Sequence, residues 1–209
     1  MDKVNFGLRF AILSVMILLT FLMQGQGHQA VYFFDYMHVS LLTRVFFFGL
    51  LLASFLPIVG SVKEWETGAT LNQLIRYKAR WHLLVKTYLR NVMILIINPL
   101  LILLADFFIF EKTALWPQFF SLIMGYIFFT SLYMLFELLF SPGPALLIIS
   151  AILLTALLVF RLPAGLAAFF LINHIAVPIW SYLGLCVATI CVLCISALFL
   201  QRKEFFGSH

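Results

Sequence analysis

The chain has 209 residues, of which 64% are hydrophobic and 10% charged, and its mean hydropathy is +1.11. Because a water-soluble domain is nearer half apolar and a quarter charged, this composition excludes a soluble enzyme or binding module and predicts an all-α, polytopic membrane protein. The net charge of +5 indicates topology rather than nucleic acid, since Lys and Arg collect on the cytoplasmic side of membrane proteins.

Apolar stretches that are long enough, or nearly so, to cross a bilayer recur along the chain. A hydrocarbon core of about 30 Å takes roughly 20 apolar residues as helix. We therefore predict one membrane domain, 1–209, with six transmembrane helices. The first is retained rather than removed as a signal peptide, because no clear cleavage site follows it. The spans are at about 7–23, 39–62, 92–110, 117–140, 144–160 and 181–200.

The positions of the basic residues predict that both termini are cytoplasmic. With the N-terminus inside, 10 of the 13 Lys and Arg face the cytoplasm, and only Arg44, Lys112 and Arg161 do not. The opposite orientation would leave only those three inside or within a span, so the positive-inside rule selects the first. The predicted location is the cytoplasmic membrane of a bacterium, as a multi-pass protein.

Arg44 and Glu137 are ionisable residues within predicted spans, where such residues are functional candidates. Arg44 lies about two turns into the second span, and it either snorkels, pairs with Asp35 or Asp106, or contacts a substrate. Glu137 lies near the inner end of the fourth span, and it either caps a helix or faces an inner vestibule. Neither position is central enough to suggest a proton relay.

Residues 161–180 are mostly apolar although the predicted topology places them outside. Two prolines and a glycine interrupt them, which fits a re-entrant hairpin of short helices before the last span. A seventh span is the alternative, but it would put the basic C-terminal residues outside. Asn173 and His174 lie mid-segment, where they either line an outer gate or satisfy the backbone of a broken helix.

Motifs of catalysis and nucleotide binding do not occur in the sequence. There is no G-x-x-x-x-G-K-[ST], no G-x-S-x-G and no H-E-x-x-H. Cys186, Cys191 and Cys194 lack the spacing of a metal site or a disulfide framework, and we predict that they are small buried hydrophobes. The chain is therefore expected to be a non-catalytic subunit without a metal or cofactor of its own.

Residues 63–91 form the only long polar stretch and hold six of the 13 basic residues. A short amphipathic helix is predicted from Ala69 to about Tyr77. A second helical pattern starts near Arg80 and runs without a breaker into the third span. Its apolar face carries Trp81, Leu84, Val85 and Tyr88, and the opposite stripe carries His82, Lys86 and Arg90. Such a segment is either an interfacial helix that binds anionic lipid or a lever moved by a cytoplasmic motor.

The order of residues here resembles the signature of the type-2 ATP-binding-cassette (ABC) exporter permeases. That family carries an acidic residue, a Gly two places on, Thr-Leu, a short coupling helix, a basic residue, and a Lys opening the next span. Ala69 separates the Gly from the Thr, and Tyr77-Lys78 stands where the family often has Pro, so the chain resembles a divergent member. The matching residues are Glu66, Gly68, Thr70-Leu71, Leu74, Arg80 and Lys86.

The resemblance implies the permease subunit of an exporter for a peptide, lipid or drug-like substrate. Two permease subunits, identical or different, would pair in the membrane. Each coupling helix would dock in a groove of a separate cytoplasmic ATPase subunit, which holds the ATP and Mg. The alternative is a non-transport membrane subunit, such as an immunity or assembly protein, in which 63–91 is a lipid-surface helix.

Each residue carried over has a physical role in such a coupling segment. Gly68 would allow a tight turn, and Leu71 and Leu74 would fill an apolar groove on the ATPase. Glu66 would bond to a helix start or to a basic partner. The basic residues Arg80 and Lys86 would anchor the bend to headgroups or to ATPase carboxylates.

Overall fold

A computed structural model describes residues 3–25, 41–66, 80–108, 116–158 and 179–202. The described residues form helices and turns without a strand, which confirms the all-α class for this part of the chain. The α-helices are α1 (Lys3–Gly25), α2 (Leu41–Phe55), α4 (Arg80–Phe108), α5 (Trp116–Leu139), α6 (Pro142–Leu158) and α8 (Ile179–Arg202), and the short 3-10 helices are η2 (Leu56–Ile58) and η3 (Lys63–Glu66).

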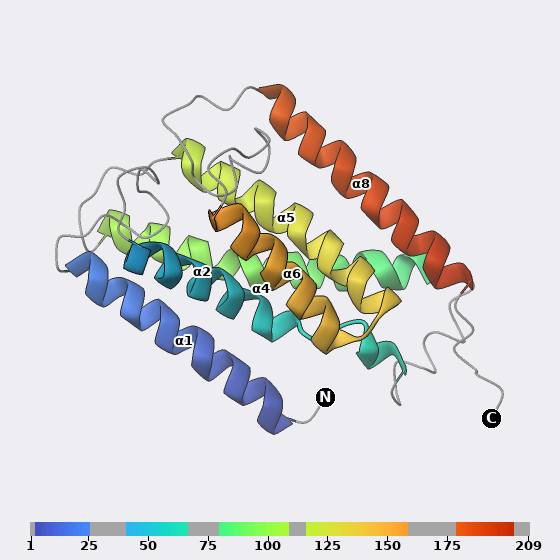
Figure 1. The fold of residues 1–209 in the computed structure, drawn as a ribbon, viewed down its shortest axis with the longest axis horizontal. Coiled ribbons are helices and arrows are strands. Elements are labelled where there is room, and N and C mark those ends of the chain that lie inside the picture. Colours follow the sequence, from blue (N-terminus) through green and yellow to red (C-terminus); the bar gives the residue numbers. More distant parts are fainter. Residues whose placement is uncertain (1–2, 26–40, 67–79, 109–115, 159–178, 203–209) are drawn as a thin grey trace.

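The helices form a bundle in which successive helices run in alternating directions (Figure 1). The start of α1, the end of α2, the start of α4 and the end of α8 therefore lie at the same end, on the right of the view. The end of α5 and the start of α6 meet there too. We call this the turn end of the bundle, because the connection after α2 is described there.

Four stretches of the described residues are long and apolar enough to cross a membrane. These are Phe48–Trp65, Trp81–Leu101, Leu122–Leu139 and Ile179–Gln201, whereas Gly7–Leu19 and Pro142–Thr155 are apolar but shorter. Several long apolar helices of this kind are compatible with the predicted membrane protein. Residues 161–178, which include most of the predicted re-entrant hairpin, lie outside the described residues.

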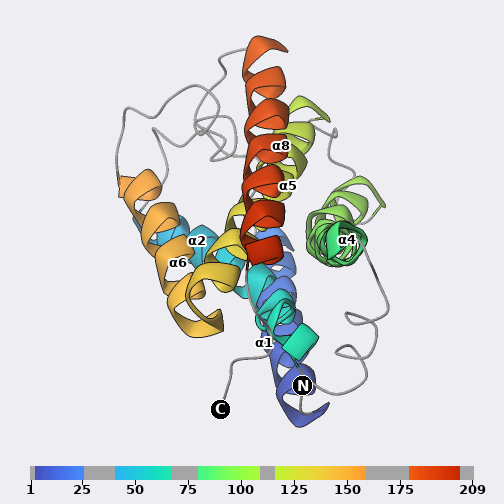
Figure 2. The ribbon, with the colours of Figure 1, turned by 90° about the vertical axis from the view of Figure 1, so that its right-hand side faces the viewer.

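Helix α5 lies at the centre of the core. It packs against α4, α6 and α8, and Figure 2 shows α4 and α6 on opposite sides of it. Tyr126, Phe129 and Tyr133 of α5 are fully buried. The ring of Phe55 at the end of α2 lies 6.1 Å from that of Tyr126 and 6.5 Å from that of Tyr133, between centroids. These aromatic contacts join the end of α2 to α5.

At the turn end, the second predicted span is longer than the observed α2, and the third predicted span begins after the start of the observed α4. The predicted span 39–62 is not one α-helix, because α2 ends at Phe55 and η2 follows. Pro57 lies within η2, where its ring has no N–H to continue the α-helical ladder. In contrast, α4 runs unbroken for 29 residues, as the pattern from Arg80 predicts, and it contains Pro99.

Candidate functional site

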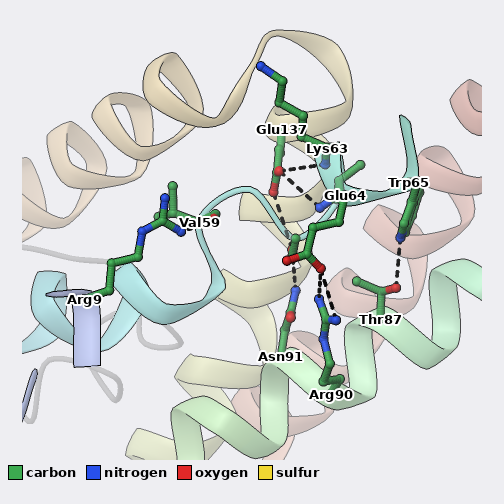
Figure 3. A network of polar contacts seen from close by, with 11 residues as sticks. Arg9, Val59, Lys63, Glu64, Trp65, Thr87, Arg90, Asn91 and Glu137 are labelled. Carbon is green, nitrogen blue, oxygen red and sulfur yellow. Dashed lines mark hydrogen bonds and ion pairs between the residues drawn. The ribbon is translucent and has the colours of Figure 1, made fainter. Parts of the chain in front are cut away.

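Residues 59–66, which we call the anchored turn, connect η2 to the predicted coupling segment and are held in the bundle by polar contacts (Figure 3). Gly60 in this turn has a φ of +88°, a backbone conformation that L side chains rarely adopt. Ser61, Val62 and Trp65 are buried, at 3%, 4% and 1% exposure. Polar groups at this depth need partners within the protein.

Glu137 of α5 supplies several of those partners. Its Oε1 accepts hydrogen bonds from the backbone N–H groups of Val62 and Lys63, each at 3.1 Å. The hydroxyl of Ser61 lies 3.5 Å from Oε2. Because amides at the start of a helical turn have no partner within the turn, the carboxyl group caps η3. Of the two roles left open by the sequence, the cap is the one observed. One turn earlier on α5, the Tyr133 hydroxyl accepts the N–H of Gly60 at 3.3 Å.

Two buried residues of α4 bind the same turn. The Nδ2 of Asn91 donates to the Ser61 hydroxyl at 2.7 Å, and the indole N–H of Trp65 donates to the Thr87 hydroxyl at 3.1 Å. The indole of Trp65 is therefore inside the bundle and hydrogen-bonded there.

Charged side chains also bind the anchored turn, at the surface of the protein. Both terminal nitrogens of Arg90 on α4 donate to Glu64 Oε2 at 3.2 Å, and the two side chains are 50% and 28% exposed. Arg9 of α1 donates to the backbone carbonyl of Val59. The anchored turn is therefore bonded to α1, α4 and α5, which belong to separate parts of the sequence.

A small pocket of about 130 Å³ opens beside the anchored turn. Its lining combines apolar groups with one carboxylate, one guanidinium, one hydroxyl and one amide. The lining residues are Pro57, Val59, Ser61, Glu64, Arg90, Asn91 and Ile94. Within the described part of the chain, no group of three or more His, Cys, Asp or Glu could hold a metal ion.

The predicted coupling residues lie on both sides of an undescribed segment. Glu66 is the last residue of η3 and Arg80 the first of α4, and both ends lie at the turn end (Figure 1). Lys86 is exposed on α4. Gly68, Leu71 and Leu74 lie outside the described residues, as do Asn173 and His174. Arg44 belongs to α2, but its side chain is not described.

Two predictions about side-chain burial need correction. Leu84 and Tyr88 are buried as the apolar face of α4 requires, but Trp81 is 40% exposed. The three cysteines of α8 are all exposed rather than buried. Helix α8 lies at the edge of the bundle, and only 22% of its apolar stretch is buried.

Sequence reasoning missed Ser61, Asn91, Tyr133 and Arg9 as members of one site. The signal for the first two was a polar residue inside, or at the edge of, a long apolar stretch. A hydroxyl or amide there needs a buried partner, but one sequence does not say which helix supplies it.

Comparison of this chain with protein-family models, with curated proteins and with solved structures gives no match. Function must therefore be inferred from the residues and their geometry. The hydrogen bonds of the site join one chain turn to three helices.

Proposed function

We propose that this chain is the permease subunit of an ABC exporter and moves a peptide, lipid or drug-like substrate across the cytoplasmic membrane. A separate ATPase chain hydrolyses the ATP. A second permease subunit completes the pathway. The observation that supports this proposal most is the bonding of the anchored turn 59–66 to α4 and α5 immediately before the segment that resembles a coupling helix.

A coupling helix moves the membrane helices only if its connections to them are stiff. Glu137 and Asn91, which bind the anchored turn, are 4% and 0% exposed, and hydrogen bonds between buried groups are costly to break. A push on the segment after Glu66 would therefore pass directly to the core helix α5 and to α4. A helix that only rests on lipid headgroups needs no such attachment, which favours the lever over the lipid-surface alternative.

The second end of the same segment is equally well placed for coupling. The segment ends at Arg80, where α4 starts and continues for 29 residues as one helix. Lys86, exposed on its outer face, is free to meet a carboxylate of an ATPase. Displacement of the segment would then tilt α4 through its first turns.

The remaining parts of the proposal concern the pathway and its outer side. Six spans are proposed, with α1 and α6 completing the four longer apolar stretches. The hairpin at 161–180 would close the outer side, with Asn173 and His174 at a gate. Arg44 in the outer half of α2 would face the pathway or a partner charge.

The first test is copurification from native membranes in mild detergent, followed by mass spectrometry. A stoichiometric P-loop ATPase is expected, and a second permease sequence would distinguish a heterodimer from a homodimer. Recovery of the chain alone, repeated in native lipid discs, would instead support the immunity or assembly protein.

The coupling role is tested by Leu74→Asp, with Asn72→Asp as the matched control on the predicted opposite face of the same helix. A charge in an apolar docking groove should weaken ATPase binding by roughly tenfold or more and abolish transport. The control should retain both. If Leu74→Asp leaves both intact, the coupling assignment is wrong.

A further inference from the structure

The pocket beside the anchored turn carries charges of both signs side by side. The Glu64 carboxylate and the Arg90 guanidinium line it, with Glu64 Oε2 3.2 Å from Nη1 of Arg90. Because the two charges are partly exposed, a ligand could bind next to the pair without separating it. A zwitterionic ligand, placed antiparallel to the pair, would put each of its charges beside the opposite charge of the protein.

One residue that lines the pocket carries a buried hydrogen-bond acceptor without a donor. Asn91 lines the pocket and is fully buried. Its Nδ2 is bound to Ser61, but its Oδ1 has no partner among the described residues. A buried acceptor without a donor is unfavourable, so a ligand that carries an N–H group into the pocket would gain by supplying one.

An apolar track leads away from the pocket along α4. Arg90, Ile94, Ile97 and Leu101 are spaced by four, three and four residues, which places them in one stripe of the helix. Ile94 lines the pocket, and Ile97 and Leu101 beyond it are 53% and 44% exposed. A headgroup in the pocket would therefore have its acyl chains along an exposed apolar stripe.

We propose that this pocket binds the headgroup of a phospholipid with a primary ammonium and a phosphate, that is, a phosphatidylethanolamine. The ammonium donates to Asn91 Oδ1 and pairs with Glu64, the phosphate pairs with Arg90, and the acyl chains lie on Ile97 and Leu101. The pocket volume of about 130 Å³ is several times what one water needs and suits a group of this size. The proposal requires that the chain lies in a membrane, not that it is an exporter.

Other membrane lipids match the pocket less well. A choline headgroup has the same charges, but its quaternary nitrogen has no N–H for Asn91. A glycerol headgroup can donate hydrogen bonds, but it brings no cation for Glu64. The three lipids therefore separate the contributions of charge and of N–H donation.

The test is the thermal unfolding of delipidated protein in detergent with each of these phospholipids added at equal acyl-chain composition. Phosphatidylethanolamine should raise the melting temperature and bind about tenfold more tightly than the choline or glycerol lipids, as expected for one charged hydrogen bond. Equal stabilisation by the ethanolamine and choline lipids would overturn the proposal. Equal binding of free phosphoethanolamine would overturn its assignment to a lipid.

Variants of the partly exposed charged side chains test which groups of the pocket bind the headgroup. Glu64→Gln should remove the preference for the ethanolamine lipid over the glycerol lipid, because it removes the partner of the cation. Arg90→Gln should weaken the binding of all three lipids, because each carries a phosphate. Lys86→Gln, which removes an exposed cation one turn earlier on α4, should leave both the preference and the affinity unchanged. If Glu64→Gln keeps the full preference and Arg90→Gln the full affinity, the lipid binds elsewhere. Loss of ATPase copurification would not change these outcomes, so the proposed function can fail without this proposal failing.

Discussion

The indole N–H of Trp65 donates a hydrogen bond of 3.1 Å to the hydroxyl of Thr87, across 22 residues of sequence. Both residues are buried, at 1% and 5% exposure. Trp65 comes just before the undescribed segment 67–79 and Thr87 two turns into the helix that follows it. The described residues that precede and follow segment 67–79 are therefore hydrogen-bonded to each other.

Trp65→Phe should destabilise the protein by about 1 kcal/mol, because it removes this hydrogen bond and keeps an aromatic ring in the core. Trp65→Ala should cost about 3–5 kcal/mol, since it also leaves a cavity. Reversible unfolding in mixed micelles measures both. Trp81→Phe is the matched control, and because Trp81 is 40% exposed it should change stability by less than about 0.5 kcal/mol. Equal effects at the two tryptophans would contradict the buried contact.

Glu137→Leu should be more damaging than Glu137→Gln. Leucine leaves the buried N–H of Val62 without its acceptor, at about 1–3 kcal/mol, and the part-buried N–H of Lys63 as well, at a smaller cost. Glutamine keeps one carbonyl oxygen for these bonds and should cost less than half as much. The same unfolding measurement ranks the variants. A Leu variant as stable as the Gln variant would mean that the cap contributes little.

Gly60→Ala should destabilise the anchored turn by about 1–2 kcal/mol, the cost of a left-handed conformation for a residue with a Cβ. The added Cβ would have nothing within 4 Å, so the cost is that of the backbone alone. Gly143→Ala, in the first turn of α6, also adds a Cβ in open space. Its φ is not positive, and it should be neutral or stabilising. If Gly60→Ala is neutral and Gly143→Ala is destabilising, the backbone of Gly60 is not the source of strain.

Labelling of single cysteines tests which side of the membrane the turn end faces. With Cys186, Cys191 and Cys194 replaced by Ala, Lys63→Cys should react with a membrane-impermeant maleimide only in inside-out vesicles. Ile179→Cys, at the other end of the bundle and 76% exposed, should react in intact cells. Reaction at residue 63 in intact cells would invert the topology and rule out the coupling proposal.

The helices were predictable from the sequence because apolar length and the positions of breakers are local properties. The long helix from Arg80 followed from its unbroken 3.6-residue pattern. The end of α2 at Phe55 was missed because the apolar run continues to Val62, and only Pro57 and Gly60 signal the change. Hydropathy does not distinguish a buried turn from a buried helix.

The candidate site was predictable only in part, because its bonds join residues far apart in sequence. Glu137 was recognised as a possible cap from its depth in a span. Its partners, 74 to 76 residues earlier, could not be deduced without the packing of α5 against the end of α2. The exposure of the cysteines on α8 depended in the same way on which helix lies at the edge of the bundle.

Protein synthesis runs from the N- to the C-terminus, and Val62 precedes its acceptor Glu137 by 75 residues. When the anchored turn leaves the ribosome, α5 has not yet been made, and the amides of the turn must stay in contact with water or headgroups. A Ser61→Cys probe should therefore react with a water-soluble reagent in chains truncated before residue 137 and be protected in the full chain. The anchored turn can therefore reach its final, buried position only after α5 has been synthesised.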